Sequence, residues 1–418
     1  MRVALSGEFA DDPEARAAAA ILRRCVHCGF CNATCPTYRL LGDELDGPRG
    51  RAYLIKGMLE GGEVTRRTQM HLDRCLTCLN CTSTCPSGVE FGPLLEIGRR
   101  LVDARVPRSP RDRLRRALLR AGLTSRWFAT AVSDARRLRP WLPRRWRDRL
   151  PVAPAAPARA AAVRAVAELG AGTRHVLLLA GCVQPSLLPN VDRATRRVLA
   201  AAGVETRFAA GAGCCGALRE HLSDPGGARA AMRRNVDAWW PALAAGEVEA
   251  IVVNASACAL SVKNYPHLLA DDPDYAAKAA AVGAATRDLG EFLGEIAPRL
   301  RGRVRTATIG PIAFHAPCTL QHGERLAGRV EAELRGLGLD VRPPPRDAHL
   351  CCGSAGAYSL LEPAIATALR DAKLRSLAET GAPTIASANV GCILHLGAGT
   401  ATPVRHWIEL LADALCEP

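Results

Sequence analysis

The sequence predicts a multidomain α+β protein, in which a small helical domain is followed by two repeats of an α/β module. Three observations lead to this prediction. Two identical cysteine patterns lie within the first hundred residues, an arginine-rich segment ends in a proline and alanine linker, and the rest of the chain contains one order of strands, helices and cysteines twice. We predict boundaries of 1–105 for the helical domain, 106–165 for the connector and linker, and 166–300 and 301–418 for the two modules.

The N-terminal cysteines form two copies of the pattern C-x2-C-x2-C-x3-C-P. The copies comprise Cys25, Cys28, Cys31, Cys35 and Pro36, and Cys75, Cys78, Cys81, Cys85 and Pro86. This is the pattern of two-cluster bacterial ferredoxins, in which three closely spaced thiolates hold one 4Fe-4S cluster and the fourth cysteine ligates the other. The sequence therefore predicts a ferredoxin-type domain with one cluster on Cys25, Cys28, Cys31 and Cys85, and a second on Cys75, Cys78, Cys81 and Cys35.

Structural zinc and disulfide bonds are the alternative uses of these eight cysteines. Zinc sites usually pair two C-x2-C units or include histidine, which leaves the third cysteine of each motif without a role. Disulfides require an oxidising compartment. The N-terminus lacks the apolar core and cleavage site of a signal peptide, and no run of about twenty apolar residues predicts a transmembrane helix. We therefore expect a cytoplasmic protein, or one that is peripheral on the cytoplasmic face of the inner membrane.

Short helices are expected to connect the two motifs. Apolar spacing predicts helices over 11–24, 51–60 and 64–74, and Gly47-Pro48-Arg49-Gly50 is expected to form a turn. A domain of about a hundred residues buries little apolar surface, so we expect the two clusters to make up much of its core.

The segment from Arg99 to Arg149 carries almost all of the net charge. It contains seventeen arginines and four acidic residues, a balance of +13, against +14 for the whole chain. A helix is expected over 111–131, with Leu114 and Leu118 on one face. A basic amphipathic helix of this kind favours peripheral contact with a membrane surface or an acidic partner, and a solvated connector is the alternative. No nucleic-acid reader motif accompanies the charge, so nucleic acid is not an expected partner. Residues 151–162 form the proline and alanine linker.

The C-terminal part of the chain contains an internal repeat. The first copy includes Cys182, Cys214, Cys215 and Cys258, and the second includes Cys318, Cys351, Cys352 and Cys392. Buried strands are expected to precede the first and last cysteine of each copy, and helices are expected over 192–202, 228–244, 324–337 and 363–380. This alternation predicts small parallel sheets with cysteines at the carboxyl ends of their strands, where ligands of open sheets collect. These eight cysteines are candidates for one further iron–sulphur cluster, and a metal-free thiol pocket is the alternative.

Two ferredoxin-type motifs followed by paired Cys-Cys-Gly modules resemble the iron–sulphur subunits of glycolate oxidase over the whole chain. Related proteins occur in anaerobic glycerol-3-phosphate dehydrogenase and heterodisulfide reductase. The resemblance is carried locally by Gly-Pro-Arg-Gly-Arg at 47–51, His-Leu-Asp-Arg-Cys-Leu-Thr-Cys at 71–78 and Cys-Cys-Gly-Ser-Ala-Gly-Ala-Tyr-Ser-Leu-Leu at 351–361. It implies transfer of electrons from flavin (FAD) subunits of a glycolate oxidase complex to a quinone or other acceptor.

One departure separates the chain from the heterodisulfide reductases, whose modules typically end in C-x2-C. Ala255 and Asn389 occupy the positions three residues before the last cysteine of each copy, so each copy keeps four cysteines. A catalytic subunit that acts on a thiol, disulfide or quinone is therefore the second hypothesis. The sequence contains no nucleophile elbow and no P-loop. We assign no catalytic residue and expect the isolated chain to be inactive. Among the histidines, His322 is the first candidate proton donor.

Overall fold

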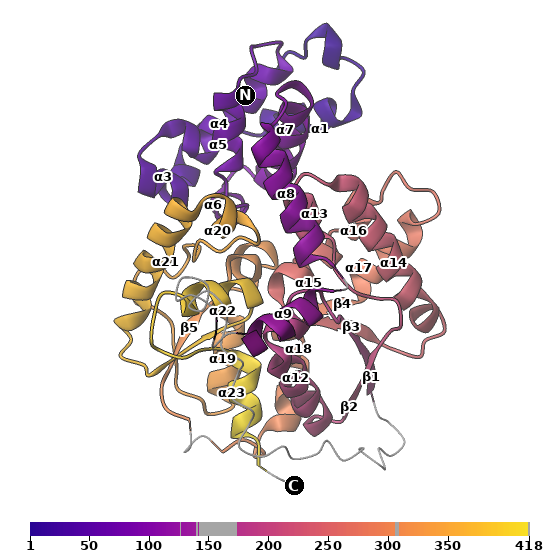
Figure 1. The fold of residues 1–418 in the computed structure, drawn as a ribbon, viewed down its shortest axis with the longest axis vertical. Helices are drawn as coiled ribbons and strands as arrows, with labels where there is room; N and C mark the ends of the chain where they lie inside the picture. Colours follow the sequence, from indigo (N-terminus) through magenta and orange to yellow (C-terminus); the bar gives the residue numbers. More distant parts are fainter. Residues whose placement is uncertain (126, 139–140, 142–173, 306–308, 417–418) are drawn as a thin grey trace.

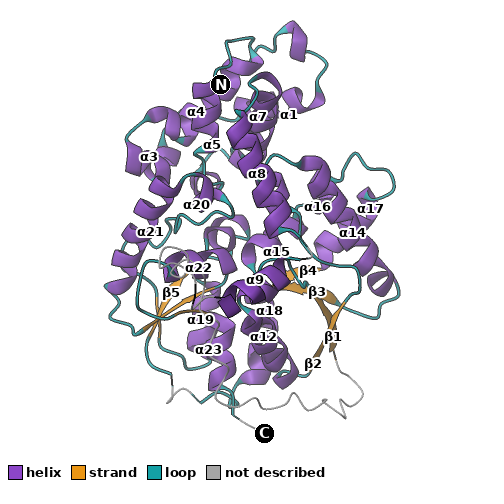
Figure 2. Cartoon of the chain, viewed as in Figure 1, coloured by secondary structure: helices purple, strands orange, loops and turns teal. Residues whose placement is uncertain are grey.

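The computed structural model describes residues 1–125, 127–138, 141, 174–305 and 309–416. The helical N-terminal domain lies at the top of Figure 1, above the two α/β modules, which lie side by side. The strands form two separate groups in the lower half of the molecule (Figure 2). The predicted linker at 151–162 lies outside the described residues.

Seven α-helices are described in the N-terminal domain. They are α1 (Pro13–Arg23), α2 (Phe30–Ala33), α3 (Pro36–Leu41), α4 (Pro48–Leu59), α5 (Arg66–Asp73), α6 (Asn80–Thr84) and α7 (Phe91–Arg105). Asp12 caps α1 by accepting hydrogen bonds from the backbone N–H groups of Glu14 and Ala15. Thr65 and Thr68 form a capping box at the start of α5.

The segment at 47–50 is the first turn of helix α4, and the predicted separate turn is wrong. Pro48 stands at the first helical position, where its missing N–H costs no hydrogen bond. Gly50 serves close packing: a Cβ atom there would lie 2.0 Å from the carbonyl oxygen of Glu44. The glycine and proline of this segment therefore begin a helix that packs tightly against the 3-10 turn Glu44–Asp46.

The N-terminal domain also has an apolar core of its own, which the sequence analysis underestimated. Helices α1, α4, α5 and α7 bury Leu22, Ile55, Leu59, Leu72 and Leu94, each no more than 1% exposed. Cys25 and Cys31 belong to the same buried cluster. The cysteines are therefore built into an apolar scaffold instead of providing most of the core.

The arginine-rich connector forms two helices, α8 (Pro110–Leu123) and α9 (Phe128–Leu138), in place of the single helix expected over 111–131. Helix α8 runs down between the N-terminal domain and the modules (Figure 1). Arg115 donates hydrogen bonds to the carbonyl groups of Leu360 and Leu361 in the second module. Arg120 donates to the carbonyl groups of Leu222 and Ser223 in the first.

Each module contains a four-stranded parallel sheet, and the two sheets have the same order. The first consists of β1 (Arg174–Leu178), β2 (Val204–Phe208), β3 (Ala250–Val253) and β4 (Thr286–Asp288) in the order β2-β1-β3-β4. The second consists of β5 (Ile312–His315), β6 (Val341–Arg342), β7 (Thr384–Ser387) and β8 (Val404–His406) in the order β6-β5-β7-β8. The strands preceding the cysteines, β1, β3, β5 and β7, are the central strands, as the repeat predicted.

Helices cover both sheets. The first module contains α11 (Gln184–Leu187), α12 (Pro189–Ala201), α13 (Ala217–His221), α14 (Pro225–Ala244), α15 (Ser256–Lys263), α16 (Tyr265–Leu268), α17 (Ala276–Ala285) and α18 (Leu289–Leu300). The second contains α19 (Arg329–Gly336), α20 (Tyr358–Leu361), α21 (Pro363–Ala378), α22 (Val390–Gly397) and α23 (Trp407–Ala414), with a π-helical turn at Thr319–Gly323.

The modules share one apolar core. Phe292 of α18, Phe314 of β5 and Trp407 of α23 are buried in the same cluster. Hydrogen bonds also join the modules: among others, Ser256 N–H donates to Ala388 O at 3.1 Å, and His406 Nε2 lies 3.0 Å from Asn254 O. These contacts lie just beyond the ends of the central strands, so the cysteines of the two modules face one another.

Candidate iron–sulphur and cysteine-rich sites

The two ferredoxin-type motifs share an unusual backbone. His27 (φ 59°) and Gly29 (φ 83°) in the first motif correspond to Thr77 (φ 52°) and Leu79 (φ 62°) in the second, and all four are left-handed. Such a conformation is uncommon for residues other than glycine and costs about 1–3 kcal/mol when the surroundings enforce it. Because the same positions are strained in both motifs, the two motifs have the same local backbone conformation, which indicates that they serve the same function.

The first group of thiols gathers around Cys31. Burial, together with the neighbouring thiols of Cys25, Cys85 and Cys28, raises the pKa of Cys31 to about 11. Three of these cysteines come from the first motif and Cys85 comes from the second. The structure therefore brings together the four residues of the first predicted ligand set.

The second group gathers around Cys81. Burial raises the pKa of Cys81 well above its ordinary value, with further contributions from the thiols of Cys75 and Cys35. Burial likewise raises the pKa of Cys78, and the thiols of Cys81 and Cys35 contribute to this shift, so they lie near Cys78. A cavity of about 40 Å³ is lined by Cys35, Cys75, Cys78 and Cys81 and by apolar residues of α4 and α7. Four thiols and apolar walls suit a 4Fe-4S cluster, and the ligand assignment itself stays a prediction.

A buried positive charge lies beside the second group. Arg51 is 3% exposed and donates hydrogen bonds to His71 O at 2.8 Å and to Thr37 Oγ1 at 3.2 Å. Its guanidinium lies 3.7 Å from the carboxylate of Asp46, which is fully buried. Cationic groups of this kind offset the negative charge of thiolate ligands, which is one of the ways a protein tunes a cluster.

The two groups differ in exposure. Cys28 of the first group is exposed, and the flanking Val26 and Phe30 are 66% and 62% exposed. In the second group, Cys78 is buried and shares an apolar cluster with Cys351, against which Cys318 packs. The first group thus reaches the surface, whereas the second adjoins the cysteines of the second module.

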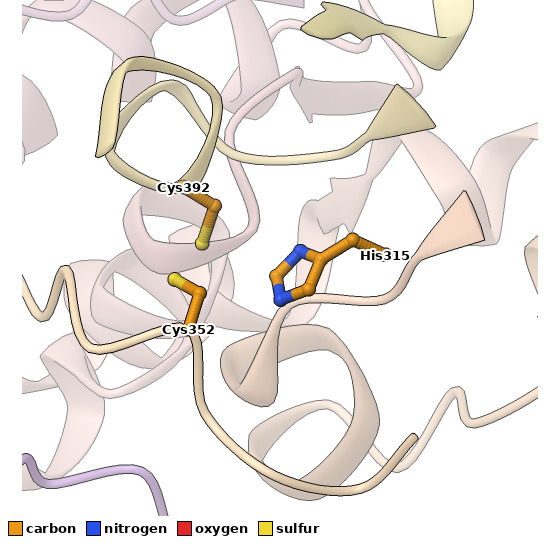
Figure 3. Close-up of side chains that lie close together, drawn as sticks. All are labelled: His315, Cys352 and Cys392. Atoms are coloured by element: carbon orange, nitrogen blue, oxygen red, sulfur yellow. The ribbon is translucent and has the colours of Figure 1, made fainter. Parts of the chain in front are cut away.

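The cysteines of the second module converge at the ends of β5 and β7. The Sγ atoms of Cys318 and Cys351 are 3.7 Å apart. Ligand atoms of His315, Cys352 and Cys392 all lie within 4.8 Å of one another, and Figure 3 shows the imidazole beside the two thiols. Asn389 donates a hydrogen bond to Cys392 Sγ at 3.6 Å. Sequence reasoning missed His315 as a member of this group.

The cysteines of the first module also converge. Contact with the Cys214 thiol raises the pKa of Cys182. Contacts with the thiols of Cys214 and Cys258, followed by burial, raise the pKa of Cys215. All four predicted residues of this module therefore lie together as well.

A cavity of about 1090 Å³ joins the two modules and the helical domain. All eight cysteines of the repeat line it: Cys182, Cys214, Cys215, Cys258, Cys318, Cys351, Cys352 and Cys392. Glu96 of α7 and His221 of α13 also line the cavity. Burial, together with the charge of Glu220, raises the pKa of Glu96 to about 7. Burial and the charge of Arg99 lower the pKa of His221 to about 4. Of these two groups, Glu96 is the one that can exchange a proton near neutral pH.

Both ring nitrogens of His322 are within hydrogen-bonding distance of other residues. Its Nδ1 lies 2.8 Å from Ser83 Oγ and its Nε2 lies 2.9 Å from the carbonyl oxygen of His349. The Nδ1 contact joins the second module to the helical domain and the Nε2 contact lies within the second module, so both ring nitrogens are used, which fits a hydrogen-bonding role better than proton donation.

Two four-thiol groups in a helical domain, joined to two cysteine-lined modules around one cavity, define a protein with several iron–sulphur centres. The sequence model of the 4Fe-4S dicluster domain matches residues 21–89, and that of the cysteine-rich domain matches residues 176–263 and 312–397. The chain is 47% identical to the glycolate oxidase iron-sulfur subunit of Escherichia coli (strain K12), with 99% of each chain covered. The chain belongs to the family of glycolate oxidase iron–sulphur subunits.

Two further relatives differ in coverage. The chain is 30% identical to the probable glycolate oxidase iron-sulfur subunit of Bacillus subtilis (strain 168), over 90% of this chain and 89% of that one. It is 31% identical to lactate utilization protein A of Bacillus licheniformis, over 53% of this chain and 90% of that protein. Within the described residues, no helix has the length and apolar character needed to cross a membrane.

Proposed function

We propose that this chain is the electron-transfer subunit of a flavin-dependent 2-hydroxyacid dehydrogenase, with glycolate as the donor and a quinone as the acceptor. One observation carries the proposal: three groups of cysteines follow one another from the exposed Cys28, through the buried Cys78, to the cavity. Iron–sulphur clusters, when bound, supply one-electron carriers. The Escherichia coli and Bacillus subtilis relatives are glycolate oxidase subunits by name, which supports the choice of donor.

The flavin-bearing partner is placed at the exposed first group. Val26 and Phe30 present apolar surface on either side of Cys28, and large exposed apolar residues that adjoin a functional group are typical of a docking surface. A partner that covered this surface would exclude water from the first group and shorten the path from its flavin.

The acceptor is placed in the large cavity. Its apolar walls include Leu179 and Ile393, which suit a quinone ring, and Glu96 supplies a carboxyl group that is protonated below about pH 7. Quinone reduction consumes protons as well as electrons, so a protonated carboxyl group in the cavity fits this acceptor better than a purely electron-accepting protein.

A second candidate function is direct reduction of a thiol, disulfide or quinone by the chain without a partner. The observation in its favour is that all eight cysteines of the repeat line one cavity. The absence of a fifth cysteine at Ala255 and Asn389 argues against disulfide chemistry of the heterodisulfide reductase kind.

Anaerobic reconstitution separates these functions. The isolated chain should bind no flavin and should not oxidise glycolate, whereas the chain combined with flavin subunits encoded nearby should reduce a soluble quinone at the expense of glycolate. Stoichiometric flavin on the isolated chain, or full quinone-linked activity in a complex that lacks it, would reject the proposal. Reduction of a disulfide by the isolated chain with an artificial donor would favour the second candidate.

A further inference from the structure

The two cysteine-rich modules have equivalent sheets but differ beside their cysteines. Counted from the cysteines of each copy, the second module has His315, Ser387 and Asn389 where the first has Leu179, Val253 and Ala255. At these three positions the first module is therefore apolar. The second module places polar side chains at the same positions, and His315 and Ser387 are as deeply buried as Leu179 and Val253.

His315 is buried in a way that requires a partner. His315 is only 2% exposed and occupies the last position of the central strand β5. Nδ1 lies 3.0 Å from Ser387 Oγ, on the adjacent strand β7. Nε2 is buried and has no hydrogen-bond partner among the described residues. An unpaired buried polar atom costs about 1–3 kcal/mol, so its retention calls for a function.

The chemistry around the ring points to a metal. The thiols of Cys352 and Cys392 lie within 4.8 Å of a ring nitrogen, and a neutral imidazole has one nitrogen lone pair available once the other nitrogen is hydrogen-bonded. In metal sites the second ring nitrogen is usually held by such a hydrogen bond, as Ser387 holds Nδ1 here. Figure 3 thus shows the imidazole beside the two thiols, in the arrangement of a metal ligand whose orientation is fixed by a hydrogen bond at its other ring nitrogen.

The surroundings of the donors favour iron over a structural zinc ion, which has no redox chemistry. The thiols of Cys318 and Cys351 also adjoin Cys78 of the second ferredoxin-type group, so a redox centre here would continue the series of centres.

We propose that His315 is a nitrogen ligand of an iron–sulphur centre held by the second module with Cys318, Cys351, Cys352 and Cys392, and that the first module holds no centre of this kind. This extends the proposed function by naming the module that holds the last centre. Histidine ligands raise the reduction potential of an iron–sulphur centre relative to cysteine, so the centre would be the most readily reduced of the series. It lies at the cavity, where electrons leave.

The test uses the full chain, reconstituted anaerobically with iron and sulphide, and needs neither flavin partner nor glycolate. Pulsed EPR on the natural-isotope chain should show a strong nitrogen coupling that changes when histidine is labelled with ¹⁵N. His315→Cys should abolish this coupling and lower the midpoint potential of the same centre. The matched control is His395→Gln, since His395 lines the same cavity but its Nε2 donates a hydrogen bond to Ala366 O at 3.1 Å.

Further variants locate the centre and keep the proposal open to rejection. Cys352→Ser should remove the nitrogen-coupled signal, whereas Cys215→Ser should leave it. Unlabelled and ¹⁵N-labelled protein with identical spectra would overturn the proposal even if His315→Cys failed to fold. Zinc in place of iron, or loss of the signal in Cys215→Ser alone, would also overturn it. Failure of hydroxyacid oxidation in the complex would leave this assignment intact and would count only against the proposed function.

Discussion

At the scale of single residues, the position of Cys35 and Cys85 decides how the two ferredoxin-type groups are built. Cys85 lies among the neighbours of Cys31, and Cys35 lies with Cys75 and Cys31 among the neighbours of Cys81, so crossed ligation stays a prediction. Pro36 begins helix α3 directly after Cys35 and so redirects the chain behind the fourth cysteine of the first motif. Crossed ligation would make the two motifs hold each other in place.

Cys35→Ser should therefore perturb the same centre as Cys78→Ser. The expected result is an altered or lost EPR signal of the second group, with the first group's signal retained. EPR spectra of the two variants and of Cys28→Ser, recorded at matched potentials, provide the comparison. A Cys35→Ser spectrum that matched Cys28→Ser would reject the crossed arrangement.

A second residue-scale prediction concerns the proton supply of the cavity. The pKa of Glu96 is raised to about 7, so this carboxyl group is protonated below that pH and ionised above it. The rate of quinone reduction by the pre-reduced chain should fall as the pH rises through 7. Glu96→Gln should remove that step and lower the rate at pH 6 about 100-fold, which is typical of a lost general acid.

Stopped-flow reduction of a soluble quinone between pH 5.5 and 8.5 measures this effect. Glu63→Gln, at an exposed position, is the control and should leave the profile unchanged. If the rate of quinone reduction by Glu96→Gln still fell as the pH rose through 7, the proton would have to come from another group.

At the scale of elements, helix α8 shows what the arginine-rich segment does in this fold. Arg108 and Arg116 are largely buried and share the carboxylates of Asp73 and Asp112. Arg111 and Arg113 are exposed. Several of the charges that favoured a membrane surface are thus used inside the molecule, and a connector is the interpretation that the described residues support.

Arg116→Gln should consequently destabilise the docking of α8, because it leaves part of the charge of Asp73 and Asp112 unpaired. The expected loss is about 1–3 kcal/mol, the usual cost of a lost charged hydrogen bond. Arg113→Gln is the matched control on the same helix and should change stability little. Thermal unfolding of the reconstituted chain compares them, and equal unfolding temperatures would mean that the ion pairs contribute nothing to docking.

Much of this organisation follows from the sequence, and the exceptions have physical reasons. The central strands are apolar runs that end near cysteines, so β1, β3, β5 and β7 were predictable. The edge strands are short and carry charged residues, as in Thr286–Asp288 and Val341–Arg342, so they have no such pattern. The spacing of cysteines predicts the thiol groups. His315 is a single residue, and its importance appears only when β5 is compared with β1 and the Ser387 contact is known.

At the scale of the whole molecule, the proposed function puts the donor at the exposed Cys28 and the acceptor in the cavity lined by the cysteines of the modules. The cavity could not be predicted, because residues of α7, α13 and α22 that are far apart in sequence build its wall. The exposed surface around Cys28 is equally a property of the folded chain.

Phe30→Asp should weaken binding of the flavin-bearing partner about tenfold or more, because a charge would replace an exposed apolar side chain beside Cys28. Leu118→Asp is the matched control, since Leu118 is 63% exposed on α8, far along the chain from the first group. Affinity measured by interferometry with the immobilised flavin subunit distinguishes them. A larger loss in Leu118→Asp would move the docking surface to α8.

The order of the cysteine groups makes a final prediction for the assembled complex. Under the proposed function, glycolate reduces the flavin of the partner without help from this chain, whereas electrons reach the quinone only through it. Cys28→Ser and Cys78→Ser should therefore abolish quinone-linked turnover, while rapid reduction of the partner's flavin by glycolate persists. Stopped-flow absorbance of the flavin, followed by quinone consumption in the same sample, separates the two steps. Because Cys28 lies at the surface and Cys78 adjoins Cys318, only the Cys28→Ser complex should regain turnover when a dye delivers electrons directly to the later groups. Equal recovery of both variants would show that the groups do not act in series.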